Sequence, residues 1–196
     1  LVFSHHHDVK TFQQKMGIRT LFWPFAYEKR NVRPQVGHKP FDLSFSGILK
    51  NIGDHNSHSD TRLRVMSELF YSIYDLPIKK KPKYKNRCFY WNSIPRSSKE
   101  KPISRKYRII KLLLPKYGYR HVDTISYFQI LTESKVVLNT LSPGGLVGPR
   151  FYESMASGSV VLCEESPMIS NVLPENSYVA FRPDMADFEA QLNYVL

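Results

Sequence analysis

The chain has 196 residues and a formal net charge of +11, and 42% of its residues are hydrophobic and 13% aromatic. This composition excludes an intrinsically disordered chain and suffices for one full hydrophobic core. No apolar run approaches the roughly 20 residues that a membrane-spanning helix needs. The N-terminus lacks a signal-peptide pattern and opens without methionine on an apolar stretch. We therefore expect a part of a longer protein.

The positive charge is concentrated between Lys79 and Lys111. Thirteen Lys or Arg residues stand there against one acidic residue, Glu100, so the rest of the chain is nearly neutral. Such a segment can bind nucleic acid or an anionic membrane surface. A solvated insertion is the commoner case, and no nucleic-acid-binding signature surrounds the segment. The sequence leaves both interpretations open.

The cysteines and histidines favour neither a disulfide framework nor a metal site. Cys88 and Cys163 fall in apolar, strand-like runs, which predicts buried free thiols in a reducing compartment. We therefore expect a cytoplasmic protein, free or associated with the cytosolic face of a membrane. His5–His7 are adjacent and point in different directions, so a cap or hinge is favoured over metal ligation. His55 and His58 are assigned to a solvated loop for want of a fourth fixed ligand.

Residues 1–40 are predicted to be the end of a preceding domain and an interdomain linker. We expect a helix over Val9–Met16, ended by Gly17, and then a short aromatic strand over Leu21–Phe25. Residues 28–40 are polar and rich in proline and glycine, which is typical of a linker.

Residues 41–196 are predicted to form a second domain, with a basic insertion at about 79–111. Short apolar runs alternate with segments whose apolar residues recur at helical spacing. Strands are expected at 41–45, 88–91, 136–138, 160–162 and 178–181, and helices at 60–73, 122–132, 149–157 and 183–196, with a short helix or a turn at 167–173. This alternation predicts an α/β fold, a Rossmann-like parallel sheet with helices on both faces.

One stretch, Lys135–Cys163, reads as strand, glycine-rich loop, helix and strand. Its loop contains Gly144, Gly145 and Gly148, and Pro149 suits the first turn of the helix that follows. Backbone N–H groups at a helix start, together with the helix dipole, favour a bound anion. Similar turns without a ligand are common in α/β proteins, so an ordinary turn is the alternative.

Two side chains of the predicted helix are candidates for ligand contacts. Arg150 lies on the first turn, where a guanidinium can bind a phosphate. Glu153 lies one turn further on the same face, where a carboxylate can accept hydrogen bonds from sugar hydroxyls. An exposed arginine and a surface ion pair are the alternatives.

Four segments resemble a known family: FDLSFSG, TRLRVMSELF, YFQILTESKVVLNT and GPRFYESMASGSVVLCEE. They are similar to the nucleotide-sugar-binding half of GT-B glycosyltransferases, and most closely to the CgeB-like or group 1 type. The segment GIRTLFWPFAY resembles the strand that leads into the second domain of that group. The resemblance covers about residues 17–196, and GPRFYESMASG is its specific part.

The resemblance implies one half of a GT-B fold that binds a nucleotide diphosphate sugar opposite a missing N-terminal domain. It implies a diphosphate site made of Gly47, Gly144, Gly145, Gly148 and Arg150, with Glu153 at the ribose. It implies a metal-independent reaction, no cofactor besides the donor substrate, and an acceptor that is a glycan, a protein or a lipid. The catalytic base is unknown, because acceptor groups and bases usually come from the other domain.

The chain departs from the family pattern at two positions. Ile48 follows Gly47 where many relatives have an arginine, and Gly145 stands where more distant relatives have a glutamate. The second hypothesis is a non-catalytic module that binds nucleic acid or an anionic surface through residues 79–111. Because Gly145 replaces the glutamate, a third is a degenerate transferase that binds nucleotide without turnover.

Overall fold

The computed structural model describes residues 1–4, 9–30, 32, 37–47, 88–92, 124–142 and 145–196. Its strands are β1 (Val2–Ser4), β2 (Thr20–Phe22), β3 (Phe41–Gly47), β4 (Cys88–Asn92), β5 (Ser134–Asn139), β6 (Val160–Glu164) and β7 (Val179–Phe181). Its helices are α1 (Val9–Met16), α4 (Thr124–Glu133), α5 (Pro149–Ala156), α6 (Pro167–Ser170) and α7 (Phe188–Val195), with a 3-10 turn η2 (Glu175–Ser177). The predicted helix at 60–73, the histidines of 5–7 and of the loop at 55–58, and most of the basic segment lie outside the described residues.

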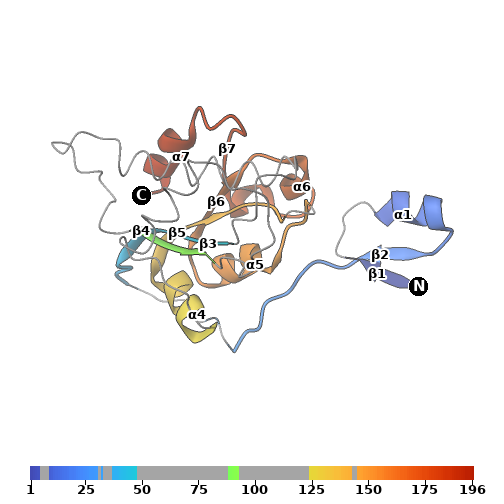
Figure 1. Cartoon of the computed structure of the whole chain (residues 1–196), viewed down its shortest axis with the longest axis horizontal. Helices are drawn as coiled ribbons and strands as arrows, with labels where there is room; N and C mark the ends of the chain where they lie inside the picture. The colour runs from blue at the N-terminus through green and yellow to red at the C-terminus, as the bar shows by residue number, and fades with distance from the viewer. Residues whose placement is uncertain (5–8, 31, 33–36, 48–87, 93–123, 143–144) are drawn as a thin grey trace, which may run out of the picture.

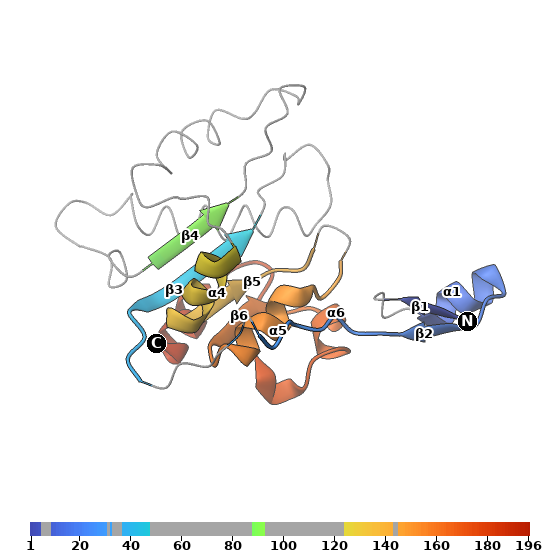
Figure 2. The same cartoon turned by 90° about the horizontal axis from the view of Figure 1, so that it is seen from below.

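Within the described residues, β4, β3, β5, β6 and β7 form one parallel sheet in that order. The chain enters at β3, moves outward to β4 and then returns past β3 to β5 (Figure 2), and it continues through β6 to β7. The direction of winding therefore reverses between β3 and β5. Doubly wound sheets bind ligands at such a switch point, beyond the carboxyl ends of the strands.

Helices cover both faces of this sheet (Figure 1). Helices α4 and α5 lie together on one side, and α7 lies on the other. In β6, Val161 and Cys163 pack in the cluster under α5, so Leu162 between them points to the opposite face. Phe188 and Leu192 of α7 are buried. The predicted α/β fold, a Rossmann-like parallel sheet with helices on both faces, is confirmed.

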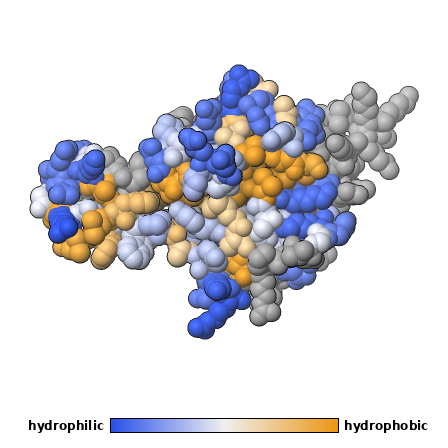
Figure 3. All heavy atoms as spheres, turned by 180° about the vertical axis from the view of Figure 1, so that it is seen from behind, coloured by the Kyte–Doolittle hydropathy of each residue, from blue (hydrophilic) through white to orange (hydrophobic). Residues whose placement is uncertain are grey.

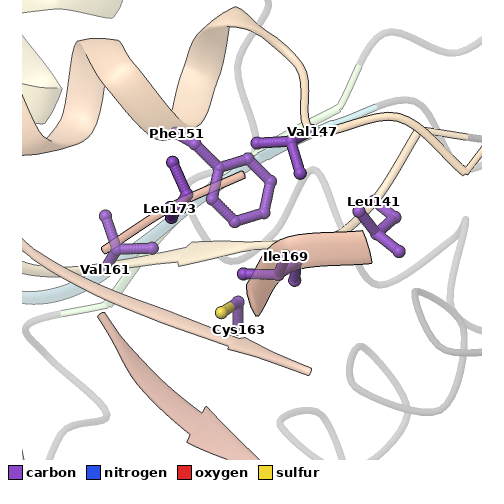
Figure 4. Packing of buried hydrophobic residues seen from close by; sticks show 7 residues of the cluster. All are labelled: Leu141, Val147, Phe151, Val161, Cys163, Ile169 and Leu173. Atoms are coloured by element: carbon purple, nitrogen blue, oxygen red, sulfur yellow. The ribbon is translucent and has the colours of Figure 1, made fainter. Parts of the chain in front are cut away.

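A cluster of buried side chains joins α5 and α6 to the sheet (Figure 4). Phe151 of α5 is 1% exposed and packs among six others: Leu141, Val147, Val161, Cys163, Ile169 and Leu173. The Cys163 thiol is free, as predicted, and burial followed by the charge of Glu164 raises its pKa. This cluster fixes where α5 begins and therefore where its first turn lies.

The N-terminal part forms a separate two-stranded parallel sheet, in which α1 connects β1 to β2. As predicted, α1 ends at Gly17, whose φ of 64° lets its N–H bond the carbonyl of Gln13 at 2.9 Å. Hydrophobic side chains are exposed on this part, which lies at the left of Figure 3: Leu1, Val2, Phe3, Met16, Ile18 and Leu21. The division into domains at residues 40 and 41 stays a prediction.

The linker touches the main sheet at two described points. Val32 is 5% exposed and packs with three side chains of α4 and β5: Phe128, Leu131 and Val137. Lys39 Nζ donates to three oxygens at 3.0 to 3.2 Å: Ser134 O, Ser157 O and Ser159 Oγ. The polar composition of residues 28–40 predicted a linker between domains but gave no sign of these contacts.

The last helix begins later than predicted. We expected it from Pro183-Asp184, but α7 begins at Phe188. The carboxylate of Asp184 instead accepts the N–H of Ala186 at 3.0 Å, a local turn that competes with a helix. Met185 then has a φ of 66°, a left-handed conformation that a right-handed helix does not contain.

Candidate functional site

Two strand ends meet at the switch point of the sheet. Phe45 of β3 lies opposite Leu138 of β5, so Ser46 and Asn139, which follow them, lie at the same carboxyl edge. Gly47 is the last residue of β3 and pairs with β4 on its other side. The loop that leaves β5 therefore starts beside the predicted glycine at the end of β3.

The loop after β5 is folded by its own hydrogen bonds. Ser142 accepts the N–H of Gly145 with its carbonyl at 2.8 Å and the N–H of Leu146 with its hydroxyl at 3.0 Å. Gly145 has a φ of 72°, which glycine adopts without strain. The buried carboxylate of Glu164 accepts the N–H of Leu141 at 2.9 Å and fixes the start of the loop. Gly144 lies outside the described residues.

Helix α5 begins beside open space. Gly148 is its N-cap residue, no side chain caps the helix, and Pro149 occupies the first turn. Among the described residues, a methyl group built on Gly148 would meet no atom within 4 Å. Pro149 has no N–H, and the N–H of Phe151 donates to the carbonyl of Gly148 at 3.2 Å. In the described residues, the N–H groups of Gly148 and Arg150 are therefore the backbone donors at this opening, beside the positive end of the helix dipole.

Arg150 reaches from the first turn of α5 to the end of β3. Its guanidinium donates a hydrogen bond to the carbonyl of Ser46. Burial lowers the pKa of Arg150, and the nearby Tyr127 and Glu153 oppose that shift. A positive charge held in a partly dehydrated place interacts strongly with an anion that enters. The structure therefore places this cation at the switch point.

The first turn of α5 is tied to the end of β5. The carbonyl of Arg150 accepts the hydroxyl of Ser154 at 2.6 Å and the amide of Asn139 at 3.4 Å. The same Asn139 amide donates to the hydroxyl of Ser154 at 3.1 Å. Since both Asn139 and Ser154 are buried, these bonds fix the helix start relative to the sheet edge.

Glu153 takes its hydrogen bond from a tyrosine of the neighbouring helix. The hydroxyl of Tyr127 in α4 donates to Glu153 Oε2 at 2.6 Å. Burial, then the hydrogen bond and charge of Glu153, raise the pKa of Tyr127 strongly, while the charge of Arg150 and a hydrogen bond with Ser46 lower it. Tyr127 therefore keeps its proton at ordinary pH. In the described part of the chain Glu153 forms no ion pair with Arg150, which removes that alternative.

The structure brings most of the predicted site residues to one edge. Gly47, Gly148 and Arg150 lie around the switch point, and Glu153 follows one turn along α5. Gly145 belongs to the loop that connects them. The sequence analysis missed four polar residues of the same edge: Ser46, Tyr127, Asn139 and Glu164. Each follows or interrupts an apolar run, which is a weak signal, because only the fold shows that they meet.

The family comparison points to one class of enzyme. Residues 101–196 match the family model described as Glycosyl transferase-like. This match covers slightly less than half of the chain and includes the loop after β5, α5 and the strands that flank them. No curated protein matches the chain significantly.

Solved structures show the same fold. Sucrose-phosphate synthase from Thermosynechococcus elongatus has a TM-score of 0.57 and 13% identity, covering 97% of this chain and 47% of that protein. A structure titled as the GtfA/B complex has a TM-score of 0.55 and 12% identity, covering 99% of this chain and 40% of that one. The chain thus spans less than half the length of either. These two likenesses show the fold, and the family match over residues 101–196 supports a glycosyltransferase-like family.

The arrangement suits a ligand that carries negative charge next to hydroxyl groups. A half-buried guanidinium and an open helix start lie on one side of the site, and a carboxylate with a fixed orientation lies one turn away. In the described residues, no three or more His, Cys, Asp or Glu side chains gather as metal ligands would. Nor does any described helix combine the length and apolarity needed to cross a bilayer.

Proposed function

We propose that this chain is the donor-binding part of a GT-B glycosyltransferase of the CgeB-like type. Its substrate is a nucleotide diphosphate sugar, and the acceptor approaches from a second domain. The proposed diphosphate site comprises Gly47, Gly144, Gly145, Gly148 and Arg150, and Glu153 binds the ribose. A cytoplasmic location belongs to the same proposal.

The opening beside Gly148 carries this proposal. In the described residues, an uncapped helix start, a neighbouring half-buried arginine and room for extra atoms occur together at the switch point of the sheet. A diphosphate needs backbone donors and a cation within a few ångströms of each other. The glycosyltransferase family match over this same region supports a sugar nucleotide over other phosphorylated ligands.

The chemistry follows from where charge develops. Transfer breaks the bond between the anomeric carbon of the sugar and the diphosphate oxygen, and negative charge builds on the leaving diphosphate. Donors and a cation already in place stabilise that charge without having to reorganise. Because Arg150 and the start of α5 supply this stabilisation, we propose a reaction that proceeds without a metal ion.

Calorimetric titration of the intact protein with UDP, GDP and ADP tests the proposal. We expect at least one of them to bind and to raise the melting temperature. Gly148→Ala places a methyl group in the proposed phosphate space and should weaken binding by about 1–3 kcal/mol, the usual cost of an added clash. Its own free energy of unfolding should change by less than about 1 kcal/mol, because the entropy gain and the poorer N-cap oppose each other.

Glu189→Ala, on the exposed side of α7, is the matched control and should bind like the wild type. The proposal is wrong if none of the three diphosphates binds. Equal diphosphate affinities of Gly148→Ala and wild type would show that the phosphate does not bind at the start of α5.

A further inference from the structure

Tyr127 and Glu153 link the two helices on one face of the sheet. Tyr127 belongs to α4, and Glu153 belongs to α5, which packs beside α4 (Figure 2). The bond between them is short, at 2.6 Å, as expected for a neutral donor and a charged carboxylate. The tyrosine ring also packs against the buried cluster around Phe128, with ring centroids 5.0 Å apart. Its hydroxyl is therefore held in place by the packing of the ring.

The hydrogen bond from Tyr127 occupies one carboxylate oxygen of Glu153 and leaves the other available to a ligand. Glu153 Oε2 accepts from Tyr127, whereas Oε1 has no hydrogen bond within the described residues. A glutamate on a helix surface otherwise samples several rotamers, and ordering such a side chain on binding costs about 0.5–1.5 kcal/mol. Tyr127 removes much of that cost in advance, because it selects one orientation of the carboxylate.

We propose that Tyr127 is a positioning residue that aims the free oxygen of Glu153 at the ribose hydroxyls of the donor. This inference rests on the proposed function and adds a residue of another helix to its site. Tyr127 does not touch the ribose in this scheme, because its proton is used on Glu153. It acts through the orientation and the charge of that carboxylate.

The neighbouring groups support this role over a purely structural link. Arg150, one turn before Glu153, donates to Ser46 and forms no ion pair with Glu153 in the described residues. The arginine thus stays directed to the end of β3, while the tyrosine holds the carboxylate. The two charges of α5 are kept for two different parts of a ligand, the phosphates and the sugar hydroxyls.

The experiment compares ribose and dideoxyribose ligands in the intact protein. Wild type and Tyr127→Phe are titrated with UDP, GDP and ADP, and each with its 2′,3′-dideoxy form. For the diphosphate that binds, we expect Tyr127→Phe to lose roughly three- to tenfold in affinity, the range for one hydrogen bond. Its affinity for the dideoxy form should match that of wild type, because that ligand lacks the hydroxyls which Glu153 would bind.

Tyr152→Phe is the matched control, because it removes a hydroxyl from the same helix as Glu153. Tyr152 packs in the Phe151 cluster and has no hydrogen bond to Glu153. Glu153→Gln provides a second route should Tyr127→Phe fold poorly. Glu153→Gln alone should lose the preference for the ribose ligand over the dideoxy ligand. The double variant Glu153→Gln with Tyr127→Phe should show no further loss of that preference.

The outcomes separate the two proposals. Equal losses for the ribose and dideoxy ligands mean that Tyr127 only supports the fold, which overturns the inference. Unchanged affinity in Tyr127→Phe overturns it as well. If wild type binds a diphosphate and its dideoxy form equally well, Glu153 does not bind the ribose, but the proposed donor site is not contradicted. A wild type that binds no nucleoside diphosphate overturns the proposed function and this inference together.

Discussion

The two edges of the main sheet are held in different ways. At the amino edge, charged side chains are paired with protein atoms: Lys39 Nζ contacts three oxygens, and Lys135 binds Asp42 at 2.6 Å. At the carboxyl edge, as far as the structure describes the chain, α5 begins without a side-chain cap and Gly148 borders open space. One edge uses its polar groups to fix the chain, and the other keeps backbone donors available.

This difference shows where function belongs in the molecule. Polar groups that bond each other contribute to the stability of the folded chain, whereas donors kept for a ligand do not. A site of this kind survives only when its surroundings are well fixed. Here the Phe151 cluster and the bonds of Asn139 and Ser154 fix the start of α5.

The largest effect is expected at Arg150, which both holds the start of α5 to β3 and belongs to the proposed phosphate site. Arg150→Met removes the donor to the carbonyl of Ser46 and the cation from the proposed phosphate site. We expect a loss of about 1–3 kcal/mol in the free energy of unfolding, and a similar loss in diphosphate binding. Urea denaturation and calorimetry measure the two. Arg150→Lys keeps the charge and should recover part of the binding. Full affinity in Arg150→Met would mean that this arginine belongs to the fold alone.

The same contrast explains what the sequence could predict. The apolar runs of β5 and β6 and the helical spacing around Phe151 identified the buried elements, because burial depends on local periodicity. The late start of α7 was missed, because the carboxylate of Asp184 formed a local turn. Contacts between distant segments had no local signal. Tyr127 reaches Glu153 across 26 residues of sequence, and Lys39 reaches Ser159 across 120.

A smaller effect is expected at the amino edge. Lys39→Met removes three hydrogen bonds that tie the linker to the start of β5 and to the turn between α5 and β6. Because the lysine is partly exposed, we expect a loss of roughly 1 kcal/mol in the free energy of unfolding. Diphosphate binding should be unchanged, since Lys39 lies at the opposite edge from Gly148. Lys10→Met on α1 is a control with the same change in charge. Weaker binding in Lys39→Met would show that the two edges are coupled through the linker.

An effect confined to high pH concerns the alkaline limit of stability. The pKa of Tyr127 is raised in the folded protein above its ordinary value of 10.0, by burial and by Glu153. The folded protein therefore keeps this proton above pH 10.0, whereas the unfolded chain releases it, so stability falls as the pH rises. Tyr127→Phe removes a group that accounts for at most one of the protons released on unfolding. One proton corresponds to a change of about 1.4 kcal/mol in the free energy of unfolding per pH unit. The free energy of unfolding of Tyr127→Phe should therefore decline less steeply than that of wild type above pH 10.0, measured by urea titrations at a series of pH values. Parallel slopes would mean that Tyr127 ionises in the folded protein as it does in the unfolded chain, and that the carboxyl edge is more hydrated than its hydrogen bonds indicate.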